Sequence, residues 1–173
     1  MPVDTWCAMA TLLPLDELVM MGDALVRRQN PFATLEELAV GVRRTSGHRG
    51  AKILREALAL VRPGVDSPKE TELRLRIVRA GFPEPEVNAR LVNRYGAFMA
   101  FGDLAYRKYR VLIEYDGGQH RDDEAQFHRD IDRLDDVVEE DWRVIRVDKS
   151  HLRRRATLVG RIRTALLAAG WHP

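Results

Sequence analysis

One acidic residue stands inside an otherwise apolar stretch of the sequence. The run YRVLIEYDGGQH has the apolar and aromatic residues of a buried strand, and Glu114 lies within it. A carboxylate buried in such a strand must be paired, neutralised or bound to a cation, because an isolated buried charge is costly. Glu114 is therefore a candidate site residue, and an ion pair with an arginine is the alternative interpretation.

A second carboxylate comes shortly before this strand. Asp103 lies in the β-like run FGDLAY, and if that run forms a hairpin with YRVLIEYD, then Asp103 and Glu114 are cross-strand neighbours that can share one cation. Two carboxylates with open coordination positions suit Mg²⁺ or Mn²⁺, whereas zinc would need more His or Cys. The alternative for Asp103 is a turn-forming Gly-Asp pair.

Three further residues extend this candidate site. Asp116 follows Glu114 by two residues and so shares its face of the strand, although Asp-Gly is also a common turn sequence. His120 can take a proton near neutral pH, act as a ligand or hold a phosphate. Glu70 lies in the first turn of a predicted helix, where it either reaches the strand ends or completes a capping box with Ser67.

The charges are distributed unevenly towards the C-terminus. Residues 103–141 contain 13 acidic and 6 basic residues, whereas residues 142–173 contain 8 basic and 1 acidic. Carboxylates for a cation beside Arg and Lys for phosphates suit a metal-dependent site on nucleic acid, and two solvated faces that neutralise each other are the alternative. The candidate phosphate-binding residues are Arg129, Arg133, Lys149, Arg153, Arg154 and Arg155. Arg129 and Arg133 form an RDxxR cluster with Asp130, and the helical spacing of this cluster also suits ordinary surface ion pairs.

The overall composition indicates a globular protein. The chain has 173 residues, of which 45% are apolar and 31% charged. No stretch approaches the roughly 18 apolar residues of a membrane span, and the first residues lack the basic region of a signal peptide. We therefore expect a cytoplasmic protein that does not associate with membranes. The single cysteine, Cys7, lies in an apolar run typical of a small buried side chain.

The first part of the chain predicts a small helical unit over residues 1–66. Thr34 stands three residues before Glu37, which is the spacing of a capping box at a helix start. From Ser67 the pattern changes to a helix that ends at Gly81, and this change places the domain boundary between residues 66 and 67.

Residues 67–173 then alternate between β-like and helical patterns. The β-like runs VNARLV, FGDLAY and YRVLIEYD come first. A long polar helix from about Asp123 to Glu140, the β run WRVIRV and an amphipathic helix capped by Ser150 follow. The predicted order is helix, two or three strands, helix, strand and helix, which defines a mixed α/β fold of the α+β type.

These segments resemble the PD-(D/E)XK nuclease superfamily, and within it bacterial proteins similar to very-short-patch repair endonucleases. The resemblance covers about residues 67–150 and implies a restriction-endonuclease-like αβββαβ core. It implies that Asp103 is the aspartate of the "PD" element and that Glu114 is the acidic residue of the next strand. It also implies that Glu70 is the helix-borne glutamate and that His120 is the histidine after the strand.

The sequence departs from the family pattern at two positions beside the site. Gly102 replaces the proline before the aspartate, and Asp116 stands where many members have lysine and the short-patch repair enzymes have histidine. His120, or the metal ion alone, would then have to assist the attacking water. The N-terminal segment is similar to one in proteins related to abortive-infection antitoxins, without the winged-helix unit that those proteins often carry upstream.

The predicted function is hydrolysis of phosphodiester bonds in DNA with Mg²⁺ or Mn²⁺, and RNA is left open as a substrate. The alternative is a non-catalytic nucleic-acid- or protein-binding module of a toxin–antitoxin or defence system. The missing lysine favours the module. Three carboxylates near one strand end, Asp103, Glu114 and Asp116, favour the nuclease, because an inactive scaffold has no evident physical reason to keep them. The apolar N-terminal helices could also join two chains as a homodimer.

Overall fold

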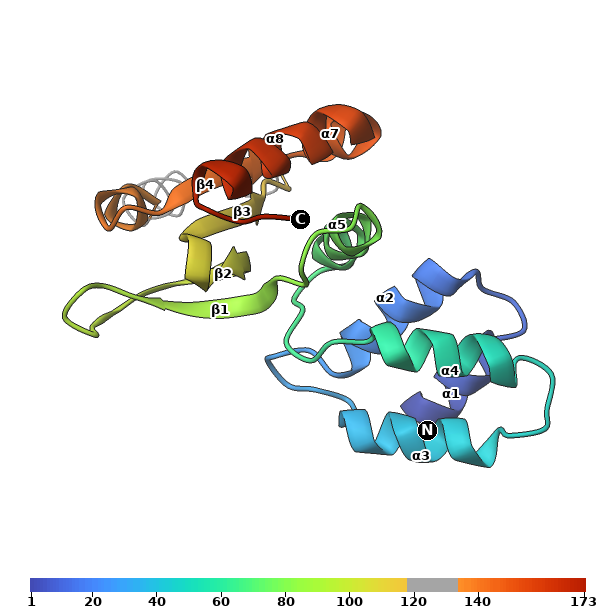
Figure 1. Cartoon of the computed structure of the whole chain (residues 1–173). Helices are drawn as coiled ribbons and strands as arrows, with labels where there is room; N and C mark the ends of the chain where they lie inside the picture. The colour runs from blue at the N-terminus through green and yellow to red at the C-terminus, as the bar shows by residue number, and fades with distance from the viewer. Residues whose placement is uncertain (118–133) are drawn as a thin grey trace. The chain divides into compact units, whose positions relative to one another are not determined.

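The computed structural model describes residues 1–117 and 134–173, and these form an α+β structure (Figure 1). The chain divides into two compact units, Met1–Leu75 and Arg76–Pro173. This division falls within helix α5 (Pro68–Arg79), whereas the sequence places the boundary just before that helix. Within the described ranges, no helix combines the length and apolarity that a membrane crossing needs.

The first unit consists of helices that pack around an apolar core. They are α1 (Pro2–Met9), α2 (Leu15–Leu25), α3 (Leu35–Arg44) and α4 (Ala51–Leu60), followed by the first part of α5. The predicted capping box at the start of α3 is confirmed: Glu37 N–H donates to Thr34 Oγ1 at 3.1 Å, and Thr34 N–H donates to Glu37 Oε2 at 2.7 Å. The two hydrogen bonds thereby satisfy two backbone N–H groups at the start of α3 that have no acceptor within the helix.

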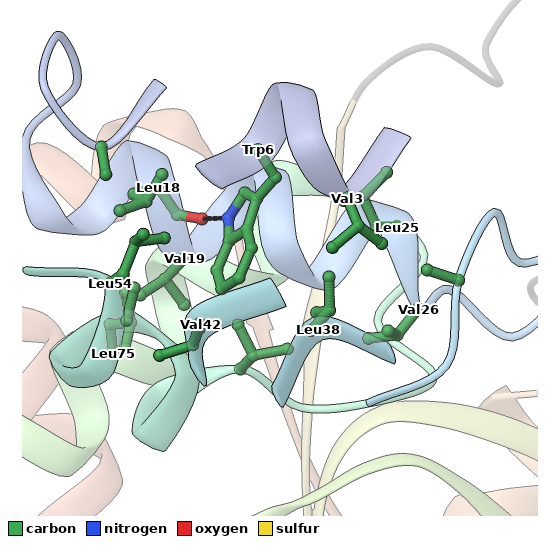
Figure 2. Close-up of a cluster of buried hydrophobic side chains, with 14 residues drawn as sticks. Val3, Trp6, Leu18, Val19, Leu25, Val26, Leu38, Val42, Leu54 and Leu75 are labelled. Atoms are coloured by element: carbon green, nitrogen blue, oxygen red, sulfur yellow. Dashed lines mark hydrogen bonds between the residues drawn. The ribbon is translucent and has the colours of Figure 1, made fainter. Parts of the chain in front are cut away.

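Trp6 is the central side chain of this core (Figure 2). Its ring is fully buried, and its Nε1 donates to the Leu18 carbonyl oxygen at 2.8 Å. Gly22 allows this packing, because a Cβ at that position would lie 2.5 Å from a Val61 methyl group and 3.4 Å from the Trp6 ring. The tryptophan thus contributes both a large apolar surface and a hydrogen bond to the unit.

An ion pair is buried beside this core. Asp23 and Arg74 are each 1% exposed, and Arg74 Nη2 donates to Asp23 Oδ2 at 3.0 Å. The same carboxylate accepts from Thr71 Oγ1 at 2.8 Å and from Arg62 N–H at 2.7 Å. Burial raises the pKa of Asp23, although Arg74 and the hydrogen bonds act in the opposite direction. The cost of burying this charge therefore offsets much of the attraction between the two side chains.

The second unit is built on a four-stranded sheet. Its strands β1 (Glu86–Val92), β2 (Phe98–Tyr106), β3 (Val111–Tyr115) and β4 (Arg143–Val147) lie in this order across the sheet. β2 pairs antiparallel with both β1 and β3, so the predicted hairpin of β2 and β3 is confirmed. β4 pairs parallel with β3, which requires a crossover connection through the residues between these strands. Residues 134–139 of that connection are helical.

The end of the chain differs from the predicted single helix. It forms α7 (Lys149–Arg153) and α8 (Arg155–Ala168), and the N-cap of α7 is Asp148. Asp148 Oδ1 accepts from the backbone N–H groups of Ser150 at 2.8 Å and His151 at 3.1 Å. Hydrogen bonds from the Ser150 side chain, and then from the backbone and side chain of His151, hold the pKa of Asp148 well below its usual range. The prediction of Ser150 as the cap is wrong, because Ser150 donates to the capping carboxylate.

Candidate carboxylate site on strands β2 and β3

The register of the β2–β3 hairpin places two predicted site residues opposite each other. Leu104 pairs with Ile113 and Ala105 pairs with Leu112. One step further along the same register, Asp103 faces Glu114. Both carboxylates therefore lie at the same end of the hairpin, on neighbouring strands.

Each of these carboxylates accepts a hydrogen bond from the backbone of the other strand. Tyr115 N–H donates to Asp103 Oδ2 at 2.7 Å, and Asp103 N–H donates to Glu114 Oε1 at 3.3 Å. Glu114 is only 9% exposed, and Asp103 is partly buried. The reciprocal hydrogen bonds fix the Asp103 side chain within β2 and the Glu114 side chain near the end of β3, and they lower the cost of burying both charges.

Gly102, next to Asp103, leaves room for the Leu112 side chain. A Cβ at Gly102 would collide with a Leu112 methyl group and lie 3.4 Å from Glu114 Oε1. Any larger residue here, including the proline of the family pattern, would require Leu112 to move. The facing strand β1 is also irregular at this level, since Asn88, between the partners of Leu104 and Gly102, has a φ of 44°.

Asp116 forms an ion pair with a residue that the sequence analysis did not single out. Its Oδ2 lies 3.1 Å from Nη2 of Arg146 on β4, and its N–H donates to the Val147 carbonyl oxygen at 2.7 Å. Arg146 is also the register partner of Glu114. A guanidinium on β4 thus lies beside β3, the strand that carries Glu114. The Arg146 side chain is 55% exposed and accessible to a ligand.

Glu70 occupies the turn that leads into α5. Its N–H donates to Ser67 Oγ at 3.2 Å, and its Oε2 accepts from Asp66 N–H at 3.1 Å. Ser67 Oγ accepts from Glu70 N–H as in the capping box that the sequence raised as the alternative, whereas the Glu70 carboxylate accepts from Asp66 N–H, one residue before Ser67. Glu70 belongs to the first compact unit, whereas Asp103 and Glu114 belong to the second.

The remaining predicted residues fall into two groups. His120, Arg129 and Arg133 lie outside the described residues. The exposed cationic residues of α7 and the start of α8 are Lys149, Arg153, Arg154 and Arg155. Lys149 comes two residues after Val147, which pairs with Tyr115, so this basic segment begins at the sheet end that carries the carboxylates.

The donor set at this end of the sheet fits a magnesium or manganese ion better than a zinc ion. Among residues 1–117 and 134–173, no group of three or more His, Cys, Asp or Glu side chains is arranged to hold a metal. Asp103 and Glu114 offer two carboxylates. Mg²⁺ in phosphate chemistry is commonly held by one or two carboxylates, and water and substrate phosphate complete its shell. A structural zinc site would instead need four protein ligands.

In comparisons with known proteins, no family model matches the chain, and no curated protein or solved structure is significantly similar to it. An α+β architecture with an open mixed sheet is compatible with many activities. Function must therefore be inferred from the residues of the carboxylate site.

Proposed function

We propose that the chain hydrolyses phosphodiester bonds in DNA with Mg²⁺ or Mn²⁺ held by Asp103 and Glu114. The observation that carries this proposal is the reciprocal hydrogen bonding of these two carboxylates at one end of the β2–β3 hairpin. When bound, the divalent ion supplies positive charge to the phosphate and assists deprotonation of the attacking water. A restriction-endonuclease-like core is part of this proposal, and the order of α5, β1, β2, β3, the helical residues 134–139 and β4 supports it.

The chain's own cations would hold the substrate. Arg146, oriented by Asp116, presents a planar guanidinium that can bind two oxygens of one phosphate. The basic segment that starts at Lys149 would contact backbone phosphates further along the DNA, without reading its sequence. The role of His120 as proton acceptor stays a prediction, as do the roles of Glu70, Arg129 and Arg133.

Amide substitutions at Asp103 and Glu114 test this proposal. An asparagine or glutamine oxygen can still accept the backbone hydrogen bonds, so D103N/E114Q removes charge and retains the contacts with Tyr115 and Asp103 N–H. Wild-type protein should nick supercoiled plasmid with Mg²⁺ or Mn²⁺, and its melting temperature should rise with metal concentration by mass action. We expect D103N/E114Q to cleave about two orders of magnitude more slowly and to lose the metal-dependent rise.

The matched control is E86Q, which removes an exposed carboxylate of the same sheet that pairs with Arg107. It should retain both cleavage and metal stabilisation. Undiminished metal-dependent cleavage by D103N/E114Q would refute the proposal. If metal raises the melting temperature and DNA is not cleaved, the same assay should be repeated with RNA as the substrate.

A second candidate function is supported by the hydrogen bonds themselves. Asp103 and Glu114 satisfy backbone donors, and Asp116 pairs with Arg146, so all three carboxylates have structural roles that need no metal. These roles, with the absent lysine, favour a nucleic-acid- or protein-binding module of a toxin–antitoxin or defence system. Such a module would show no rise in melting temperature with Mg²⁺ or Mn²⁺. Homodimerisation through the N-terminal helices stays a prediction under either function.

Arg146 should contribute to cleavage through its charge. We expect R146Q to slow single-turnover cleavage about 10- to 100-fold, because hydrogen bonds to charged groups are worth about 1.5–3 kcal/mol. R146K should recover part of the rate, since it keeps the charge and loses the planar fork. R143Q on the same strand, where Arg143 is exposed and pairs in register with Val111, is the control and should cleave normally. Equal rates for R146Q and wild type would exclude a role in phosphate binding.

A further inference from the structure

The charges of the helical unit are segregated along its sequence. Residues 43–55 contain five Arg and Lys and no Asp or Glu, whereas the rest of residues 1–66 contains three basic and eight acidic residues. The near-zero net charge of this unit therefore conceals one strongly basic segment. Its cations define what we call the basic turn: Arg43, Arg44, Arg49, Lys52 and Arg55.

The basic turn is presented to solvent by the packing of α3 and α4. Leu38 and Val42 on α3 and Leu54 on α4 are buried in the core, which directs the opposite faces of these helices outward. All five cations of the basic turn are exposed, and Lys52 has 88% of its side chain accessible.

Acidic neighbours neutralise only part of this charge. Arg44 lies 3.5 Å from Asp4, and Lys52 lies 4.0 Å from Glu56, both between exposed side chains. In the part of the chain that the structure describes, Arg43, Arg49 and Arg55 form no ion pair. Exposed ion pairs of this kind are weak, so the electrostatic potential around the basic turn stays positive.

The surface beside the basic turn is concave. A groove opens between α1 and α3, and its lining includes Arg44, His48 and Arg49 together with Thr11 and Thr45. Asp4, which pairs with Arg44, also lines this groove. Cationic and hydroxyl groups therefore lie together in one groove, and one carboxylate lies beside them. Groups of these types bind phosphate oxygens in nucleic-acid complexes.

We infer that the basic turn is a nucleic-acid contact that binds the phosphate backbone without reading its sequence. Four of its five cations are arginine, whose fork matches the oxygens of a phosphate. A membrane surface is the less favoured partner, because membrane-binding faces combine basic residues with exposed apolar ones, and no large apolar side chain is exposed within residues 43–55. This inference goes beyond the proposed cleavage site and does not depend on it.

The test is DNA binding by the full chain in EDTA, where cleavage plays no part. Fluorescence anisotropy of a labelled DNA duplex, measured over a series of NaCl concentrations, gives the slope of log K against log [NaCl]. Each phosphate contact contributes about 0.9 to this slope. We expect R43Q/R49Q/R55Q to reduce the magnitude of the slope by about two to three, and R43K/R49K/R55K to retain it.

A second triple variant, R153Q/R154Q/R155Q, separates this inference from the proposed function. It removes cations of the other unit and should lower the slope independently of the basic turn. Unchanged melting temperatures would show that the variants are folded. An unchanged slope for R43Q/R49Q/R55Q would overturn the inference, as would a loss of binding to anionic phospholipid vesicles with DNA binding intact. Absence of cleavage in Mg²⁺ would contradict only the proposed function.

Discussion

Replacing Asp23 with alanine should destabilise the helical unit by about 3–5 kcal/mol. The substitution leaves the Arg74 guanidinium buried at 1% exposure and removes the acceptor of the Thr71 hydroxyl and the Arg62 N–H. A buried charge without its counter-ion keeps the full cost of desolvation, so the loss exceeds the net value of the intact pair.

Hydrogen exchange followed by mass spectrometry suits this measurement, because a chain of two units need not unfold in one step. Peptides from residues 1–75 of D23A should exchange faster by about two to four orders of magnitude. E56A is the matched control, since its pair with Lys52 is exposed and worth about 0.3–0.5 kcal/mol. In D23L/R74M, which removes both charges, much of the protection should return. Protection in D23A equal to that in E56A would contradict the prediction.

Replacing Trp6 with alanine should cost the same unit about 3–5 kcal/mol. The indole is fully buried among α1, α2 and the residues around Val61, and its removal leaves a cavity next to Gly22. The Leu18 carbonyl oxygen also loses its donor. The rigid contacts around the ring prevent the unit from collapsing into the space.

The conservative variant W6F separates the two contributions of this side chain. Phenylalanine keeps much of the apolar volume and loses the Nε1 donor together with part of the indole ring, so we expect a loss of about 1–2 kcal/mol. Hydrogen exchange of peptides from residues 1–75 would again provide the measurement. A loss in W6A no greater than that in W6F would show that the cavity is filled by rearrangement of the core.

Local patterns in the sequence predicted the local structure well. The three-residue spacing of Thr34 and Glu37 identified a capping box, and the apolar run around Glu114 identified β3. The N-cap residue of α7 was predicted incorrectly, because two residues of suitable type lie close together in the sequence. Asp148 and Ser150 both suit a helix start, and the carboxylate of Asp148 accepts two backbone N–H groups at once.

Contacts between distant segments were harder to predict. Arg146 meets Asp116 through a parallel pairing of strands separated by a long crossover, and the sequence does not indicate the register of that pairing. Asp23 meets Arg74 across 51 positions of the chain, and neither residue stands in a recognisable motif. The sequence was sufficient to predict that Asp103 and Glu114 lie opposite each other, because a short hairpin limits the possible registers of its two strands.

The reciprocal hydrogen bonds between β2 and β3 give Asp103 and Glu114 a structural role that does not depend on catalysis. The sequence alone offered no reason for an inactive scaffold to retain Asp103 and Glu114. The structure supplies one, because loss of either carboxylate leaves a backbone donor at the strand ends without its acceptor. A lineage that abandoned catalysis would therefore still select against alanine at both positions. Amides would be tolerated in that lineage and eliminated in one that retained catalysis, so the two histories leave different substitutions at the same sites.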